Sequence, residues 1–177
     1  MTEPAPGRRV ALVTGGGTGI GAACCRALAE AGFRVGVHYR SSEALALALV
    51  AELPEAFAVR ADLAVPAEID ALVAELKQRA GRVDVLVNNA GYNVNAPMLT
   101  MKLDDYDAVA AMARATWYLT KLVLRRFMFR QGGRIINLSS VVGHTGNPGQ
   151  IPTRWSRRGS TPSPSRWPRS SPGATSR

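Results

Sequence analysis

Short apolar runs and longer segments with helical spacing alternate along the first 138 residues of the chain. Residues 10–13 form the first apolar run, and a cluster of glycines separates it from residues 20–31, whose apolar positions recur with a helical period. Gly32 follows that segment as a helix stop. An apolar run of this length is typical of a strand buried on both faces of a parallel sheet. The segment therefore predicts a strand, a glycine turn and a helix.

The alternation continues to residue 138. Further strands are predicted at residues 34–39, 56–60, 83–87 and 134–138, with helices at residues 43–53 and about 104–129. One more helix lies between the third and fourth strands, where apolar residues recur at i, i+3, i+4 and i+7 until Gly81 ends the pattern. These residues are Ile69, Leu72, Val73 and Leu76. Strict alternation implies a parallel sheet with helices on both faces, so the predicted fold class is α/β, a doubly wound Rossmann sheet.

The charge of the chain is unevenly distributed. It has 22 basic and 13 acidic side chains, but six of the arginines lie in residues 151–177, which contain no acid. Residues 1–150 therefore carry 16 basic against 13 acidic side chains, which gives no indication of a nucleic-acid partner. The amino terminus has no apolar signal region, and no run approaches the roughly 18 apolar residues that span a bilayer. We therefore expect a cytoplasmic protein with neither a membrane nor a nucleic-acid partner.

The two cysteines, Cys24 and Cys25, are adjacent on the first predicted helix, where geometry disfavours a mutual disulfide. Cys24 falls on the apolar stripe with Ile20, Leu28 and Ala31. Burial as a small apolar side chain is the expected role of such a thiol. No metal site is predicted.

Glycines dominate the turn after the first strand. Gly15, Gly19 and Gly21 let the backbone turn tightly and approach a pyrophosphate, whose charge would lie against the N–H groups at the start of the next helix. Three glycines can also form a turn that binds no ligand. The position of this cluster, after a buried strand and before an amphipathic helix, favours a dinucleotide site.

Three motifs occur in the order and spacing of one known family. They are Thr14-Gly15-Gly16-Gly17-Thr18-Gly19-Ile20-Gly21, Asn88-Asn89-Ala90-Gly91 and Ile136-Asn137-Leu138-Ser139-Ser140. With these motifs the chain resembles the short-chain dehydrogenase/reductase family, whose members use NAD(P) to interconvert ketones and alcohols. The resemblance implies that the cofactor contacts Thr14, Gly15, Gly17, Thr18, Gly19, Ile20, Gly21, Asn89, Ala90 and Gly91. It also implies that Asp62 caps the adenine amino group with Leu63 against the ring, although Asp62 could equally be only a turn residue.

The end of the second predicted strand indicates which cofactor is used. An acid there would accept hydrogen bonds from the ribose 2′-hydroxyl and would repel a 2′-phosphate. The chain has no acid at this point and instead offers Arg40, Ser41 and Ser42, groups that suit a phosphate. NADPH is therefore favoured over NADH, with a merely solvated Arg40 as the alternative.

The resemblance implies four catalytic groups: a serine that holds the substrate oxygen, a tyrosine as general acid or base, a lysine beside it, and an asparagine on the long helix. Ser140 matches the serine. The tyrosine and lysine positions fall on Thr153 and Arg157, which cannot replace the expected residues. The asparagine is absent, and the long helix is one residue shorter than the family pattern near Met112 and Ala113. Such a deletion would rotate the rest of the helix by about 100°.

The end of the chain breaks the pattern. Residues 151–177 contain seven serines, six arginines and five prolines without periodicity, a composition typical of a disordered tail. A shifted reading frame also explains why the tyrosine and lysine are missing. One frame over, the codons around Thr153 permit tyrosine and those around Arg157 permit lysine, and the codons that follow permit an amphipathic helix. We therefore expect residues 1–152 to be an incomplete Rossmann domain and residues 153–177 to be an out-of-frame, disordered tail that follows the loss of one base.

Three functions remain open from the sequence. Residues 143–150, which follow Ser140, look most like those of the 3-oxoacyl-acyl-carrier-protein reductase and acetoacetyl-CoA reductase group, so the first is NADPH-dependent reduction of a 3-oxoacyl thioester. The second is a catalytically dead NADPH-binding fragment that lacks the tyrosine and lysine. The third is a nucleic-acid binder that acts through the arginine-rich tail.

The resemblance also bears on assembly. Family members form homotetramers or dimers, and their long helix and the helix after the tyrosine build the subunit interface. Without the second of these helices, the long one should expose surface meant for a partner, including Trp117, Leu119, Leu122 and Val123. A sheet that ends at its fifth strand would also leave an unpaired edge. We therefore expect the chain to aggregate or partly unfold and not to form a regular oligomer.

Overall fold

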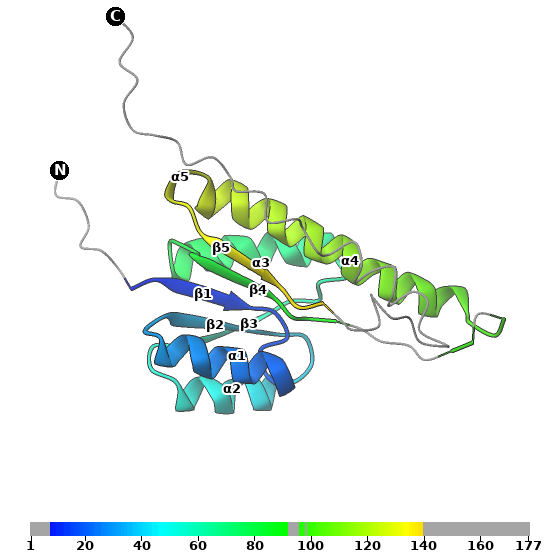
Figure 1. The fold of residues 1–177 in the computed structure, drawn as a ribbon, viewed down its shortest axis with the longest axis horizontal. Coiled ribbons are helices and arrows are strands. Elements are labelled where there is room, and N and C mark those ends of the chain that lie inside the picture. Colours follow the sequence, from blue (N-terminus) through cyan, green and yellow to red (C-terminus); the bar gives the residue numbers. More distant parts are fainter. Residues whose placement is uncertain (1–7, 92–95, 98, 140–177) are drawn as a thin grey trace, which may run out of the picture.

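A computed structural model describes residues 8–91, 96–97 and 99–139. Within these residues, five parallel strands form one sheet in the order β3-β2-β1-β4-β5 (Figure 1). The strands are β1 (Val10–Val13), β2 (Arg34–Tyr39), β3 (Phe57–Arg60), β4 (Val85–Asn88) and β5 (Arg134–Asn137). The order reverses between β1 and β4, as in a doubly wound sheet. The predicted α/β Rossmann architecture is confirmed.

Helices cover both faces of this sheet (Figure 1). The helices α1 (Gly19–Glu30) and α2 (Glu43–Glu52) lie on one face, and α3 (Pro66–Arg79) and α4 (Leu103–Val123) lie on the other. A π-helical turn, η1 (Leu124–Met128), and the short helix α5 (Phe129–Gln131) continue α4 toward β5. Because both faces are covered, β1 is buried along its whole length, which explains why its sequence is entirely apolar.

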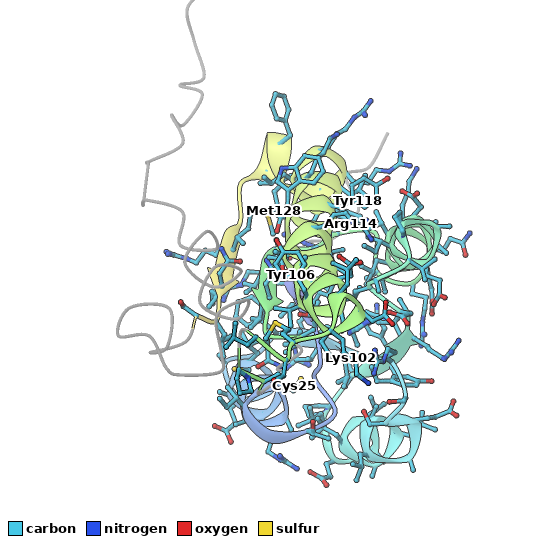
Figure 2. The ribbon with its side chains drawn as sticks, turned by 90° about the vertical axis from the view of Figure 1, so that its right-hand side faces the viewer. Cys25, Lys102, Tyr106, Arg114, Tyr118 and Met128 are labelled. Atoms are coloured by element: carbon cyan, nitrogen blue, oxygen red, sulfur yellow. The ribbon has the colours of Figure 1, made fainter. Side chains whose placement is uncertain are left out.

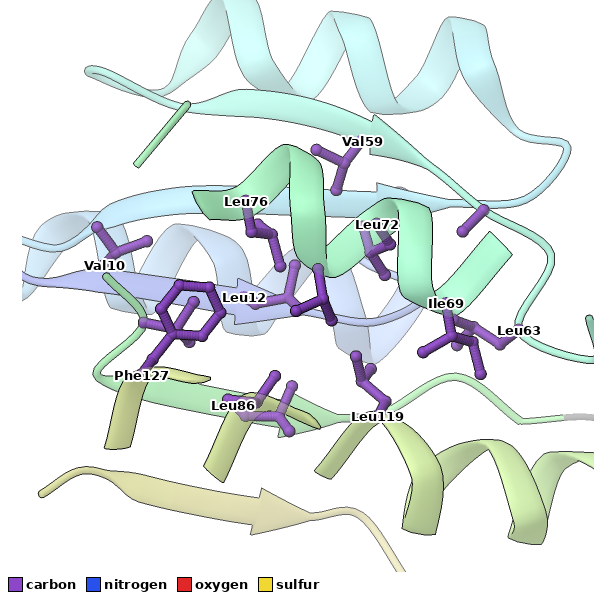
Figure 3. Packing of buried hydrophobic residues seen from close by; sticks show 14 of the residues in the cluster. Val10, Leu12, Val59, Leu63, Ile69, Leu72, Leu76, Leu86, Leu119 and Phe127 are labelled. Carbon is purple, nitrogen blue, oxygen red and sulfur yellow. The ribbon is translucent and has the colours of Figure 1, made fainter. Parts of the chain in front are cut away.

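Two layers of apolar side chains hold the helices on the sheet. In the larger layer, leucines of α3 and α4 pack against leucines of β1 and β4 (Figure 3). These residues are Leu72, Leu76, Leu119, Leu12 and Leu86, each at most 1% exposed. Burial of one leucine contributes about 2 kcal/mol, so this layer fixes α3 and α4 beside each other. On the opposite face, α1 and α2 pack on the alternate side chains of β1 and β2.

The face that α4 turns toward the sheet differs from the prediction. Leu119 and Val123 are fully buried, Leu122 is partly buried, and Trp117 is 61% exposed. The expectation that all four would be exposed for a partner was therefore wrong for Leu119 and Val123. Their spacing of four residues places both on the side of the helix that covers the sheet.

The π-helical turn keeps the end of the long helix on the sheet. Buried residues of α4 recur every four residues from Ala115 through Leu119 to Val123. In an α-helix of 3.6 residues per turn, that spacing rotates the buried face by about 40° at each step. A π turn holds one more residue and reverses this rotation. Phe127 and Met128 consequently remain buried.

The buried side of α1 consists of small residues. They are Gly21, Ala22, Cys25 and Ala29. The predicted apolar stripe was wrong in position, since Ile20 is 65% exposed and Cys24 is only partly buried. The close approach of this helix to the glycine turn favours small side chains on its inner face. A buried thiol is present at Cys25, and burial, with a smaller contribution from Cys24, raises its pKa to about 12. That thiol is therefore an unreactive core group.

Candidate nucleotide-binding site

The turns that follow β1, β2, β3 and β4 meet at one edge of the sheet. They comprise residues 14–18, 40–42, 61–65 and 89–91. In an open parallel sheet, ligands bind outside the carboxyl ends of the strands, at the point where the strand order reverses. Here the reversal lies between β1 and β4, so the glycine turn and the turn that begins at Asn89 flank the candidate site.

Thr14 and Asn89 join these two turns. The Thr14 hydroxyl donates to the Val87 carbonyl at 3.2 Å and accepts the N–H groups of Asn89 and Ala90, each at 3.0 Å. In return, Nδ2 of Asn89 donates to the carbonyls of Thr14 at 2.9 Å and Gly15 at 3.1 Å. Both side chains thus bind the protein's own backbone and shape the site. Their contact with a cofactor stays a prediction.

The glycines of the turn are needed for two different reasons. Gly15 and Gly19 have φ angles of 62° and 51°, in the left-handed region that glycine adopts at little cost. Gly21 is needed for space, since a Cβ at this position would overlap the carbonyl oxygen of Gly15 and lie 2.6 Å from Nδ2 of Asn89. The absence of a side chain therefore lets the start of α1 approach the turn.

His38 holds the turn from the other side. Its Nδ1 accepts the Gly15 N–H at 3.1 Å, its Nε2 lies 3.0 Å from the Ala61 carbonyl, and its own carbonyl accepts the Gly16 N–H at 2.8 Å. Burial lowers the pKa of His38 to about 4, although the bond to Ala61 and the charge of Asp62 favour the protonated ring. Sequence reasoning missed this residue. The available signal was a histidine in a buried strand beside a glycine turn.

Asp62 forms the turn after β3. Its Oδ1 accepts the Ala64 N–H at 2.9 Å, and its own N–H donates to Oε2 of Glu68 at 2.6 Å. The adjacent Leu63 is 7% exposed and belongs to the apolar layer under α3. The turn role considered for Asp62 is therefore present in the structure. Its contact with adenine, and that of Leu63, stay predictions.

Groups suited to phosphate surround the start of α1. The first N–H groups of a helix have no intrahelical acceptor, and they carry the positive end of the helix dipole. The first turn of α1 contains no acidic residue, and Thr18 precedes it without capping it through its side chain. Arg40 and Ser41 are exposed in the loop after β2, and Ser42 Oγ lies 3.1 Å from the position of a Cβ on Gly17. This donor set fits a dinucleotide phosphate.

Hydrogen bonds join the helix α4 to the turn after β3 and to α3. Arg114 donates to the Ala64 carbonyl at 3.1 Å, and the Tyr118 hydroxyl donates to Asp70 of α3 at 2.9 Å. In Figure 2 both side chains lie on the side of α4 that faces α3. The first bond holds the turn that contains Leu63, and the second holds α3 against α4.

A second polar cluster, which the sequence did not reveal, lies at the ends of β4 and β5. Nδ2 of Asn88 donates to Oγ1 of Thr120 at 3.0 Å and to Oδ1 of Asn137 at 2.7 Å. Asn88 is 4% exposed, so these bonds satisfy a buried amide. The cluster joins α4 to the strand that leads to Ser140.

The rest of the predicted site lies outside the described residues. This applies to Ser140, Thr153 and Arg157 and to residues 143–150. Within the described part of the chain, no group of histidine, cysteine, aspartate or glutamate side chains is arranged to hold a metal ion. No helix in that part is long and apolar enough to cross a membrane.

Known proteins are similar to this chain over most of its length. A family model for the short chain dehydrogenases matches residues 9–152. A 3-oxoacyl-[acyl-carrier-protein] reductase of Synechocystis sp. is 44% identical over 147 residues, which are 80% of this chain and 60% of the relative. The chain therefore spans about 60% of the length of the curated relatives it matches.

Two solved structures extend the comparison to a bound cofactor. The angucycline C-6 ketoreductase LanV with bound NADP matches with a TM-score of 0.77 at 32% identity, over 85% of this chain and 62% of that one. A blue fluorescent protein from a metagenomic library, in complex with NADPH, matches with a TM-score of 0.80 at 37% identity, over 85% of this chain and 64% of that one.

Proposed function

Because the chain belongs to the short-chain dehydrogenase family, we propose that the intact protein is an NADPH-dependent oxidoreductase that reduces a 3-oxoacyl thioester to its 3-hydroxy form. The observation that carries the proposal is the glycine turn, which His38 and Asn89 hold beside the start of α1. The side chain of Thr18 does not cap this helix start. The name of the 44% identical relative supports the thioester substrate.

The loop after β2 supports NADPH as the cofactor. Arg40 and Ser41 are exposed there, and residues 40–42 contain no carboxylate to repel a 2′-phosphate. A guanidinium binds phosphate through charge-assisted hydrogen bonds. The two structural neighbours with bound NADP and NADPH agree with this choice.

The proposed reaction divides between the cofactor and the chain. Once bound, NADPH would supply a hydride to the carbonyl carbon of the substrate. The N–H groups at the start of α1 would hold its pyrophosphate, and Ser140 would donate a hydrogen bond to the substrate oxygen. The proton that completes the alcohol requires an acid, and the chain has Thr153 and Arg157 where the family has tyrosine and lysine. We therefore propose that the 177-residue chain binds NADPH but is catalytically inactive.

A shifted reading frame accounts for Thr153 and Arg157. The family match ends at residue 152, immediately before Thr153, and this boundary supports the proposal that residues 153–177 are read out of frame. The test is the nucleotide sequence across codon 153. Read one frame over, it should encode tyrosine, then lysine four codons later, and continue as an open frame. A stop within the first twenty or so shifted codons, or a missing lysine, would contradict the proposal.

Assembly follows from the same reasoning. We propose that the intact protein is a cytoplasmic homotetramer or dimer and that the 177-residue chain does not assemble regularly. Trp117 of α4, 61% exposed, supports an interface on this helix. Size-exclusion chromatography with circular dichroism tests the proposal. If the 177-residue chain gives a sharp tetramer peak with a cooperative thermal transition, the proposal that this chain does not assemble regularly is contradicted.

Activity measurements separate the enzyme from the inactive fragment. NADPH oxidation with acetoacetyl-CoA by the chain as it stands should equal the no-enzyme control, since general-acid catalysis alone supplies about 10² to 10⁴-fold. Restoring the frame should recover turnover, and Ser140→Ala should then remove most of it. Turnover by the unrepaired chain would refute the roles assigned to the missing residues.

A further inference from the structure

His38 is a buried polar residue, and the proposed reaction assigns it no role. It lies near the carboxyl end of β2 and is 2% exposed. Its ring reaches from the Gly15 N–H, 3.1 Å from Nδ1, to the Ala61 carbonyl, 3.0 Å from Nε2. Gly15 begins the turn proposed to hold pyrophosphate, and Ala61 immediately precedes Asp62 at the proposed adenine end. One side chain thus connects both ends of the dinucleotide site.

The two neighbours of the ring permit a single protonation state. The Gly15 N–H is a donor, so Nδ1 must carry a lone pair, and the Ala61 carbonyl is an acceptor, so Nε2 must carry the proton. A proton on Nδ1 would face the Gly15 N–H and break that bond. The charged group that acts on the ring is Asp62, and burial outweighs its effect on the His38 pKa. The ring is therefore neutral at neutral pH.

The main chain of the same residue reinforces the contact. The His38 carbonyl accepts the Gly16 N–H at 2.8 Å, so one residue fixes two successive amides of the turn. From the opposite side, Asn89 fixes the carbonyls of Thr14 and Gly15. With the turn held at both its N–H and C=O groups, the direction of the donors at the start of α1 is determined.

We propose that His38 is a positioning residue for the dinucleotide: by bridging the Gly15 amide and the Ala61 carbonyl, its neutral ring sets the glycine turn at the correct distance from the adenine end. This inference rests on the proposed binding of NADPH. A purely structural histidine would support the fold without affecting ligand affinity once the protein is folded. The two roles therefore differ in a measurable way.

Equilibrium dialysis with NADP⁺ compares the chain with three variants. His38→Leu removes both side-chain bonds, whereas His38→Asn keeps an acceptor close to the position of Nδ1. Val35→Ala is the matched control, because Val35 is fully buried in the same strand but faces the other side of the sheet. Loss of one hydrogen bond to the turn should raise the Kd for NADP⁺ about tenfold in His38→Leu. His38→Asn should recover most of the affinity, and Val35→Ala should lose stability with no change in Kd.

A second ligand locates the effect. Adenosine 2′,5′-bisphosphate carries the adenine end and the 2′-phosphate but has no pyrophosphate, so His38→Leu should weaken it less than NADP⁺. Equal Kd values in His38→Leu and the parent chain, or equal losses in the leucine and asparagine variants, would overturn the inference. If the leucine variant does not fold, His38→Gln, which keeps only the donor to Ala61, replaces it and should bind more weakly than His38→Asn. If the parent chain does not bind NADP⁺, the proposal that the 177-residue chain binds the cofactor fails, and the inference about His38 falls with it.

Discussion

Gly21→Ala adds one methyl group where α1 passes closest to the glycine turn. An ideal Cβ at this position overlaps the carbonyl oxygen of Gly15 and lies 2.6 Å from Nδ2 of Asn89. Neither neighbour is free to move, because that Nδ2 group donates to the carbonyls of Thr14 and Gly15. The substitution must therefore displace either the start of α1 or the turn.

Two effects of opposite sign decide the result. Alanine is more favourable than glycine inside a helix by about 1 kcal/mol, so helix propensity alone predicts a more stable chain. Overpacking costs about 1–3 kcal/mol, and contact with fixed main-chain atoms places the cost at the upper end of this range. We expect a net loss of about 2 kcal/mol in the free energy of unfolding for Gly21→Ala. Displacement of the N–H groups proposed to hold the phosphate should also raise the Kd for NADP⁺ more than about tenfold.

Pulse proteolysis across a urea series measures both quantities at protein concentrations too low for aggregation. Repeating the series with NADP⁺ gives the affinity, because a ligand that binds only the folded chain raises its stability in proportion to ln(1 + [L]/Kd). Gly32→Ala is the matched control, since its Cβ would meet no atom within 4 Å and only its φ of 84° opposes the change. That control should cost about 1 kcal/mol and leave the affinity unchanged. A Gly21→Ala chain of unchanged or higher stability, with unchanged affinity, would refute the steric reasoning.

Three further predictions concern polar groups that are buried or partly buried. The folded-state pKa of His38, about 4, lies below its ordinary value of 6.5, so the unfolded chain binds more protons between these two pH values. The free energy of unfolding should therefore fall by up to about 3 kcal/mol as the pH drops through this range. The urea midpoints at about pH 7 and about pH 5 should differ less in His38→Asn than in the parent chain. Partial burial raises the pKa of Asp84, but hydrogen bonds from Arg82 and the Val10 N–H hold it below its usual value overall. Asp84→Asn should therefore lower the free energy of unfolding by about 1–2 kcal/mol at pH 7. The difference in urea midpoint between the variant and the parent chain should narrow as acid protonates the Asp84 carboxylate of the parent. Thr120→Val removes one acceptor of a buried amide and should lower the free energy of unfolding by about 1 kcal/mol, whereas equal urea midpoints would show that the amide finds another partner.

The alternation of apolar runs and helical segments was sufficient to predict the order of the elements. Both ends of β2 agree with the prediction, because Arg34 and Tyr39 lie at clear changes in the pattern. The third helix was predicted from four apolar positions, and all four are buried. Strands covered on both faces and helices with one apolar face leave this signal in any chain.

Features that depend on contacts between distant segments were not predictable. The buried face of α1 is set by how closely the helix approaches the turn, so Ile20 is exposed although its spacing suggested burial. Sequence spacing also did not show that Leu119 faces the sheet. The roles of His38 and of the cluster around Asn88 require partners 23 to 49 residues away along the chain. Pattern analysis within one segment does not contain that information.

The way the glycine turn is held has a consequence for synthesis of the chain on the ribosome. Contacts from His38 connect the turn to a segment 23 residues away and can form once β2 has emerged. Contacts from Asn89 and Ala90 span 74 to 76 residues, so they require β4 to have joined the sheet. Loop-closure entropy makes these contacts the slower to form. A nascent chain therefore passes through a stage in which one side of the candidate nucleotide site is present and the other is still being translated.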